Sequence, residues 1–157
     1  MVKQELKIAI DPGWSGAMVW QAEGLTTFVE KCPATAADMN HLVENVVAVR
    51  ALGYEPRCVL ERVSAFPGQG VTSVWKFSAN YHLWQGMLTA HRIPYQLVSP
   101  AKWQKHLGGL PSGKDKKKER KNQIKAFAQR LYPHLRVTLA SADALAMLAV
   151  FDSVWTK

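Results

Sequence analysis

The chain has 157 residues, 48% of them apolar and six of them tryptophan, which suits one domain with a buried core over residues 1–157 and leaves too little chain for two. No apolar run approaches the roughly 20 residues of a membrane-spanning helix, and no basic-then-apolar leader opens the sequence, so we expect a cytoplasmic protein. Cys32 and Cys58 lack zinc-site spacing and are too few for a disulfide framework, which favours a reducing compartment.

The positive charge of the chain is concentrated in one segment. The formal net charge is +8 at pH 7, and residues 99–136 hold eleven Lys and Arg against two Asp and Glu, so the remaining residues carry a net charge of −1. A charge run taken alone is usually a solvated surface. Its concentration here, with Trp103, Phe127 and Tyr132 interleaved, favours a site that binds a polyanion.

Short apolar runs predict three strands near the N-terminus, at residues 6–10, 16–21 and 25–29, which form an antiparallel meander. Thr35 with Asp38 predicts the start of a helix that ends before Gly53. The run RCVLE, which ends at Glu61, predicts a fourth strand. A strand, helix and strand of these lengths favour a parallel pairing of the fourth strand with the first.

The second half of the chain is predicted to be mainly helical. After a loop rich in Pro and Gly, apolar residues at spacings of three and four predict a long helix; they are Val71, Val74, Phe77, Tyr81, Trp84 and Leu88. The run YQLV predicts a fifth strand, and further helices are expected at residues 101–107, 114–131 and 141–154. The predicted fold is a mixed five-stranded α/β sheet with helices on both faces.

Three carboxylates stand at the ends of predicted elements. Asp11 and Glu61 end parallel strands, where ligands bind in such sheets, and Asp143 lies in the first turn of the last helix. Singly, each has an ordinary role: Asp11 in a turn, Glu61 in an ion pair with Arg62, Asp143 at a helix dipole. Together they would repel one another without a cation, and paired Mg²⁺ ions about 3.5–4 Å apart are the recurring device for attack on a phosphodiester. With the basic segment, this pattern favours a metal-dependent nuclease.

Four stretches, in order and over nearly the whole chain, resemble the RuvC family of Holliday-junction resolvases: IAIDPGWSGAMV, VLERVSAFPGQGVTSVWKF, IPYQLVSPAKWQKHL and ADALAMLA. The second is most similar to the compact phage and prophage branch. The resemblance implies an RNase H-like fold, a homodimer, a role in DNA recombination and repair in a bacterial cell or phage-infected host, and Mg²⁺- or Mn²⁺-dependent nicking of opposed strands in a four-way junction. It implies that Asp11, Glu61 and Asp143 are the catalytic metal ligands, with two ions per site.

The sequence departs from the family at one position of this site. Members commonly carry a further Asp or His three positions before the last carboxylate, where this chain has Ala140. Three carboxylates with more water, a substitute such as Asp152 or His134, or an alanine introduced to trap an inactive form would each account for it. Asp152 lies more than two helical turns beyond Asp143, which makes it the poorer substitute. The alternative function is therefore a catalytically weakened or inactive protein that binds junctions or branched DNA.

The remaining predicted site residues bind DNA. The resemblance places the loop after Glu61 at the junction crossover, where Phe66 would stack on an unpaired base, unless it fills a turn as part of the core. Gly13 and Gly16 are expected to clear space for a phosphate. The predicted phosphate contacts are Lys76, Lys102, Lys105, Lys114, Lys116, Lys117, Lys118, Arg120 and Lys121.

A nucleotide-binding domain of the actin-like type is a further alternative, because it also opens with a strand, an Asp and a Gly turn. That fold needs a second domain to close its cleft, which 157 residues do not supply. It also gives no reason for the lysine cluster, so the nuclease is the favoured hypothesis.

Overall fold

A computed structural model describes residues 4–64, 68 and 70–156, and its centre is a mixed sheet of five strands. In chain order they are β1 (Gln4–Asp11), β2 (Ala17–Ala22), β3 (Phe28–Lys31), β4 (Tyr54–Glu61) and β5 (Tyr95–Val98). Their spatial order is β3-β2-β1-β4-β5, with β1 antiparallel to β2 and parallel to β4. The predicted α/β class, the meander and the parallel pairing are confirmed.

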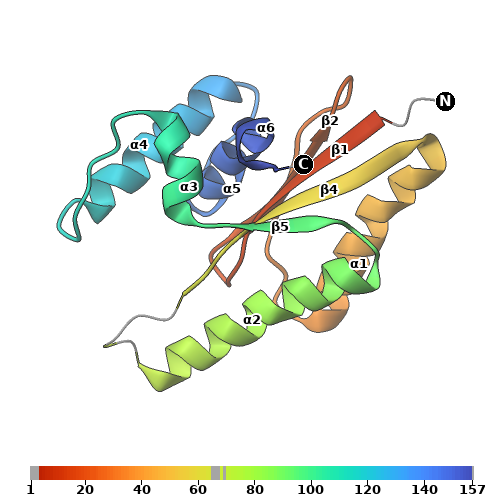
Figure 1. Ribbon diagram of the computed structural model, residues 1–157, viewed down its shortest axis with the longest axis horizontal. Coiled ribbons are helices and arrows are strands. Elements are labelled where there is room, and N and C mark those ends of the chain that lie inside the picture. The colour runs from red at the N-terminus through yellow and green to blue at the C-terminus, as the bar shows by residue number, and fades with distance from the viewer. Residues whose placement is uncertain (1–3, 65–67, 69, 157) are drawn as a thin grey trace.

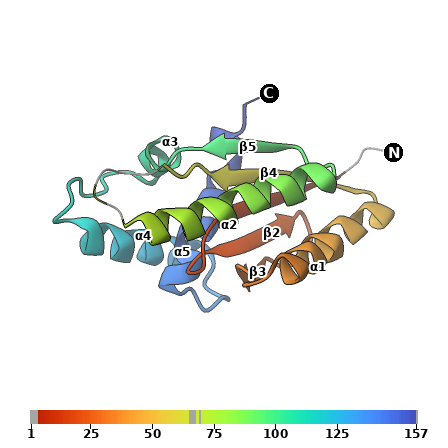
Figure 2. The same ribbon diagram turned by 90° about the horizontal axis from the view of Figure 1, so that it is seen from below.

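Helices cover both faces of the sheet (Figure 1). One face carries α1 (Ala36–Val47) and α2 (Val71–Ala90), which Figure 2 shows in front of the strands. The other carries α5 (Leu139–Ala149), against which α4 (Lys117–Leu131) packs, together with α3 (Pro100–Gln104) and α6 (Phe151–Val154). Two 3₁₀ turns, Ala48–Leu52 and Lys105–Leu107, follow α1 and α3. Thr35 is the N-cap of α1, as predicted: its side chain accepts from the Asp38 backbone N–H.

Several element boundaries differ from the prediction: α4 begins at Lys117 rather than at residue 114, the helix predicted at residues 101–107 is α3 followed by a 3₁₀ turn, and two further differences have a local cause. The third strand lies at Phe28–Lys31 instead of residues 25–29. The backbone N–H of Leu25 donates to the Ala22 carbonyl and closes a turn there, so the strand begins only after residues 25–27. The last helix begins at Leu139 and breaks at Val150. Its start is set by a capping box in which Thr138 and Ser141 bond reciprocally, a local polar signal that apolar periodicity does not register.

The aromatic residues of the basic segment belong to the core. Trp103 is fully buried and Tyr132 is 7% exposed, and Phe127 packs partly buried against the same cluster beneath α5. The interpretation of these rings as part of a polyanion surface is wrong, because α3 and α4 need an apolar side to pack on α5. Only the charged residues of the segment remain for binding.

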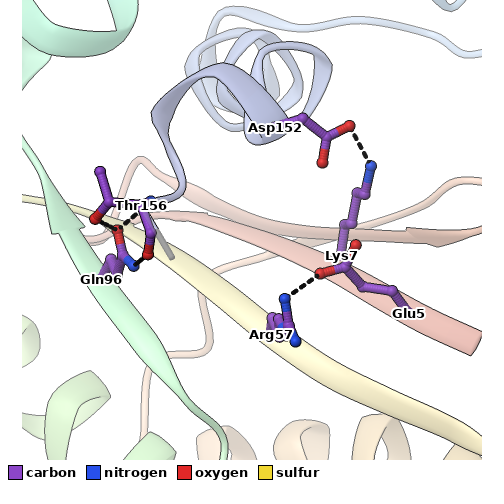
Figure 3. Close-up of polar contacts among 6 residues, drawn as sticks. All are labelled: Glu5, Lys7, Arg57, Gln96, Asp152 and Thr156. Carbon is purple, nitrogen blue, oxygen red and sulfur yellow. Dashed lines mark hydrogen bonds and ion pairs between the residues drawn. The ribbon is translucent and has the colours of Figure 1, made fainter. Parts of the chain in front are cut away.

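The C-terminal segment is tied to β1 and β5, as Figure 3 shows. Lys7 pairs with Asp152 at 2.6 Å, and Gln96 accepts hydrogen bonds from the backbone N–H and the hydroxyl of Thr156, both at 3.0 Å. The rings of Phe151 and Trp155 stack at 5.4 Å. These contacts fix the C-terminal side of α5 against the sheet.

Both cysteines are buried and free, in keeping with the predicted absence of a disulfide framework. Burial, and next the charge of Asp11, raise the pKa of the Cys32 thiol to about 12, so the thiol stays protonated. Its sulfur donates to the backbone carbonyl of Asp11 at 3.2 Å. Among the described residues, no helix has the length and apolar character that crossing a bilayer requires.

Candidate active site

Asp11 and Glu61 end neighbouring parallel strands and face the same side of the sheet. Side chains alternate along a strand, and Ala9 and Val59 pack beneath α5, so the two acids, each two residues further on, also point to the α5 face. The residues just before them in β1 and β4 are register partners, so both carboxylates stand at the same height at the strand ends. This is the edge at which open α/β sheets bind ligands.

The turn after Asp11 has no room for larger residues. A Cβ on Gly16 would lie 1.9 Å from the backbone carbonyl oxygen of Asp11. Gly13 has a positive φ of 113°, its N–H donates to Oδ1 of buried Asn80 at 2.9 Å, and a Cβ there would meet the Phe77 ring at 3.0 Å. The expectation that Gly16 clears space for a phosphate is wrong, since the backbone of Asp11 fills that space; for Gly13, which lines a cavity, the expectation stays a prediction.

Gly16→Ala is expected to lower the free energy of unfolding by at least about 2 kcal/mol, because the new methyl group overlaps a backbone carbonyl that β1 holds in place. Urea denaturation measures this. Gly86→Ala on α2 is the matched control: its Cβ meets nothing within 4 Å, so that helix should gain about 0.5–1 kcal/mol. A Gly16→Ala protein as stable as the wild type would contradict the observed turn.

Asp143 completes the group from α5, although it lies beyond the first turn that was predicted for it, because the helix begins at Leu139. Burial, and next the charges of Glu61 and Asp143, raise the pKa of Asp11 well above its usual value. Burial and then the charge of Asp143 raise the pKa of Glu61 to about 7, and burial raises that of Asp143. The structure thus brings the three predicted carboxylates into one low-dielectric site, where each is costly to ionise.

Lys121 is the cation that the three carboxylates share. Its charge lowers the pKa of Asp11, Glu61 and Asp143, although each of these pKa values stays raised because burial is the larger effect. Lys121 lies on α4 and its side chain is exposed. The lysine predicted to contact phosphate therefore stands beside the candidate catalytic group.

A hydrogen bond that the sequence did not predict orients Glu61. The indole Nε1 of Trp103, on α3, donates to Oε2 of Glu61 at 2.7 Å. The bond favours the charged carboxylate and so lowers the pKa of Glu61, in opposition to burial. Because Trp103 is fully buried, its ring also fixes the direction of the second carboxylate oxygen.

Trp103→Phe is expected to raise the pKa of Glu61 above its value of about 7 and to destabilise the fold by about 1–3 kcal/mol, because Oε2 loses a buried donor. NMR titration of the Glu61 carboxyl carbon in metal-free protein checks the first effect. Trp84→Phe, at a fully buried Trp of the core on the opposite face, should cost packing energy and leave the Glu61 titration unchanged. An unshifted Glu61 in Trp103→Phe would rule out the orienting role.

The three carboxylates suit a hard divalent cation by their chemistry, because Mg²⁺ prefers carboxylate oxygens. Across residues 4–64, 68 and 70–156, however, no three His, Cys, Asp or Glu side chains are gathered so that they could hold one ion. Charge repulsion among carboxylates opposes such a cluster when no cation is present. Joint ligation by Asp11, Glu61 and Asp143 therefore requires their side chains to turn toward the ion.

The two suggested substitutes for a ligand at position 140 are engaged elsewhere. Asp152 is an exposed side chain paired with Lys7 (Figure 3), and His134 is exposed with its ring edge-on to Tyr132. Ala140 itself is half-buried and lines a cavity together with the turn that follows Asp11.

Most of the predicted phosphate-binding residues lie on the surface. Lys114, Lys116, Lys117, Lys118 and Lys121 are exposed around the start of α4, and Lys76 and Lys105 are exposed on α2 and in the turn after α3. Lys102 is half-buried on α3. Phe66 lies outside the described residues. The contacts of these lysines and of Phe66 with DNA stay a prediction.

Arg120 has a structural contact. Its guanidinium donates to the backbone carbonyls of Pro111 at 2.9 Å and Gly113 at 3.3 Å, which fixes the loop before α4. Its charge also lowers the pKa of Asp143.

Three site residues escaped the reasoning from sequence: Trp103 as a hydrogen-bond donor, Lys121 as the neighbour of the carboxylates, and Asn80 as the anchor of the Gly13 turn. Only Asn80 had a local signal, because it is a polar residue three positions after Phe77 on the apolar stripe of a helix. The other two depend on how α3 and α4 pack.

No model of a known protein family matches the chain, and no curated protein matches it in sequence. Solved structures do match it in fold. A Thermus thermophilus RuvC in complex with a Holliday junction substrate is 14% identical, with a TM-score of 0.56 over 92% of this chain and 90% of that one. A second T. thermophilus RuvC structure is 13% identical, with a TM-score of 0.55 over 95% of this chain and 97% of that one. Over more than nine tenths of its length, this chain therefore has the fold of RuvC, the RNase H-like mixed sheet.

Proposed function

We propose that the protein is a metal-dependent, structure-specific endodeoxyribonuclease that resolves four-way DNA junctions by paired nicking of opposed strands. The observation that carries the proposal is the site itself: half-buried Asp11, Glu61 and Asp143, with pKa values raised by desolvation, lie near one another at one end of the sheet, and the charge of Lys121 acts on all three. The fold supports it, because a RuvC with this fold forms a complex with a Holliday junction substrate.

Mg²⁺, or Mn²⁺ in its place, is the proposed cofactor, with two ions per site held by Asp11, Glu61 and Asp143. When bound, such ions polarise the phosphodiester and lower the pKa of an attacking water. Trp103 keeps Glu61 in one orientation. The Lys121 ammonium draws a phosphate toward three acids that would otherwise repel it.

A homodimer is part of the proposal. Two opposed strands are cut only if two active sites are held at a fixed separation, and a two-fold axis provides this with one kind of chain. Light scattering on the purified protein should therefore give a mass near twice 17.5 kDa. A monomeric mass in the presence of bound junction would contradict paired nicking.

The deciding experiment incubates the protein with a labelled four-way junction and with a linear duplex of the same arm sequence, in Mg²⁺ and in Mn²⁺. We expect symmetric nicks in opposed strands of the junction and none in the duplex. Asp11→Asn is the matched variant and should bind the junction without nicking it. Equal cutting of both substrates would overturn the structure specificity, and loss of junction binding in Asp11→Asn would mean that Asp11 is structural.

The second candidate is a junction-binding protein with weakened or absent catalysis. It is favoured by Ala140 and by the lack, within the described ranges, of three acidic, His or Cys side chains already gathered around one point. Tight junction binding with no nicking in either metal would select it. Nicking that Ala140→Asp restores would then identify the missing ligand as the cause.

A further inference from the structure

A groove opens between the turn that follows Asp11, the first turns of α2 and the start of α5. Its volume is about 650 Å³, and its walls include Trp14, Lys31, Ser73, Lys76, Phe77 and Ala140. Trp14 follows Asp11 by three residues, and Ala140 precedes Asp143 by three. Ala140 thus brings the first turn of α5 to the groove.

Trp14 is held in place although it is exposed. The turn that carries it is fixed on one side by the Gly13 N–H bond to buried Asn80, and on the other by the Gly16 N–H bond to the Gly13 carbonyl at 3.1 Å. Yet 49% of the Trp14 surface is accessible, whereas Trp84 and Trp103 are fully buried. A rigid turn that presents a large aromatic ring to solvent is ready to bind a flat apolar ligand.

The walls of the groove carry one sign of charge. Lys31 and Lys76 are both exposed, and no Asp or Glu is among the described residues that line it. Its occupant should therefore combine negative charge with a flat aromatic face. A second cavity of about 220 Å³ shares Trp14 and Lys76 with the groove and is also lined by Thr35 and by Trp75, which is 77% exposed. The aromatic and basic surface thus extends from Trp14 to Trp75.

We propose that this groove binds an unpaired nucleotide of the DNA strand beside the one being cut, with its base stacked on Trp14 and its phosphates near Lys31 and Lys76. The inference rests on the proposed function and adds a single-strand subsite to it. The volume suits one or two nucleotides, since small-ligand sites span roughly 300–1,000 Å³. Stacking on an aromatic ring tolerates any base, so the subsite would add affinity without sequence preference.

The test uses fluorescein-labelled decathymidylate and the same decamer made of abasic residues, with binding followed by anisotropy in EDTA so that nothing is cut. Trp14→Leu should weaken decathymidylate binding at least fivefold and leave binding of the abasic decamer unchanged. Trp14→Phe, which keeps an aromatic face, should recover most of the affinity. Lys31→Gln and Lys76→Gln should weaken both probes. Arg92→Gln is the charge control: it removes one exposed cation at the far end of α2 and should affect neither.

Two results would overturn the subsite: unchanged decathymidylate binding in Trp14→Leu, or an equal loss for the abasic decamer, which would mean that no base is stacked. Equal thermal unfolding of all variants verifies that they are folded. Junction nicking separates this inference from the proposed function. If the wild type binds decathymidylate through Trp14 but nicks no junction, only the proposed nuclease function is overturned. If it nicks junctions normally but binds decathymidylate independently of Trp14, only the subsite is overturned.

Discussion

Asp11→Asn is expected to make the metal-free protein more stable at neutral pH, by about 1–3 kcal/mol, while it abolishes nicking. Burial and the charges of Glu61 and Asp143 raise the pKa of Asp11, so its ionised form destabilises the fold. The amide has the same shape and no charge, so the substitution also removes the charge repulsion between residue 11 and Glu61. At about 2–4 °C per kcal/mol for a chain of this size, the melting temperature should rise by several degrees.

The pH dependence of this gain has a definite sign. A carboxyl whose folded pKa is raised binds more protons in the folded state, so stability is lost as pH rises through the interval between the two values. For Glu61 that interval runs from 4.5 to about 7. Metal-free wild type should therefore lose stability across it, and Asp11→Asn should lose less, with the two curves meeting at low pH.

Calorimetry in EDTA from pH 4 to pH 8 measures both curves. Added Mg²⁺ should stabilise the wild type more than Asp11→Asn, because a bound cation removes the repulsion that the substitution has already relieved. Asp38→Asn is the matched control, as it removes an exposed carboxylate that lies in the first turn of α1 and accepts from the Thr35 hydroxyl, and it should not stabilise the protein at any pH. A wild type whose metal-free stability rises steadily from pH 4.5 to 7 would contradict the buried site.

Neutralising Lys116, Lys117 and Lys118 together is expected to flatten the salt dependence of junction binding. Each phosphate contact contributes about 0.9 to the slope of log affinity against log salt, so the slope should fall by about 2–3. All three side chains are exposed at the start of α4, and the 3.5 Å pair of Lys116 with Glu119 is an exposed contact of little energy. Affinity at low salt should fall steeply, with no change in which junction sequences are bound.

Filter binding or anisotropy between 50 and 250 mM salt gives the slope. Arg92→Gln serves again as the control, because the connection between α2 and β5 lies at the opposite end of the sheet from α4 (Figure 1). An unchanged slope in the triple Lys→Gln variant would show that the cluster faces solvent in the complex. A slope lowered equally by Arg92→Gln would indicate a general charge effect.

The candidate site could largely be predicted from the sequence, because Asp11 and Glu61 each follow a short apolar run that predicts a strand. The apolar run before Asp11 and the run RCVLE before Glu61 are short strands, and the pairing rule for a strand, helix and strand makes them parallel neighbours. Alternation along each strand then turns both carboxylates to one face. Asp143 lies among alanines and serine, a composition that predicts a helix able to approach Ala9 and Ala17 closely.

Other features were out of reach because they arise from contacts between distant segments. Trp103 lies 42 residues from Glu61 in sequence, and only the packing of α3 brings its indole N–H to the carboxylate. The aromatic residues of the basic segment were expected on the surface and lie in the core, because only the packing of α3 and α4 on α5 buries them. Gly16 was expected to leave space for a ligand, but the backbone carbonyl of Asp11 occupies that space.

The sequence by itself determined the α/β class, the strand pairing around β1, the three acids and the basic segment, since each depends on periodicity, composition or chain connectivity. Tertiary structure alone decided which cation stands beside the acids, which donor orients Glu61, and that Trp14 faces a basic groove rather than the core. The reason is physical: hydrophobic periodicity is a property of neighbouring residues, whereas burial, charge interaction and hydrogen bonding depend on distances that only the packed sheet and helices set.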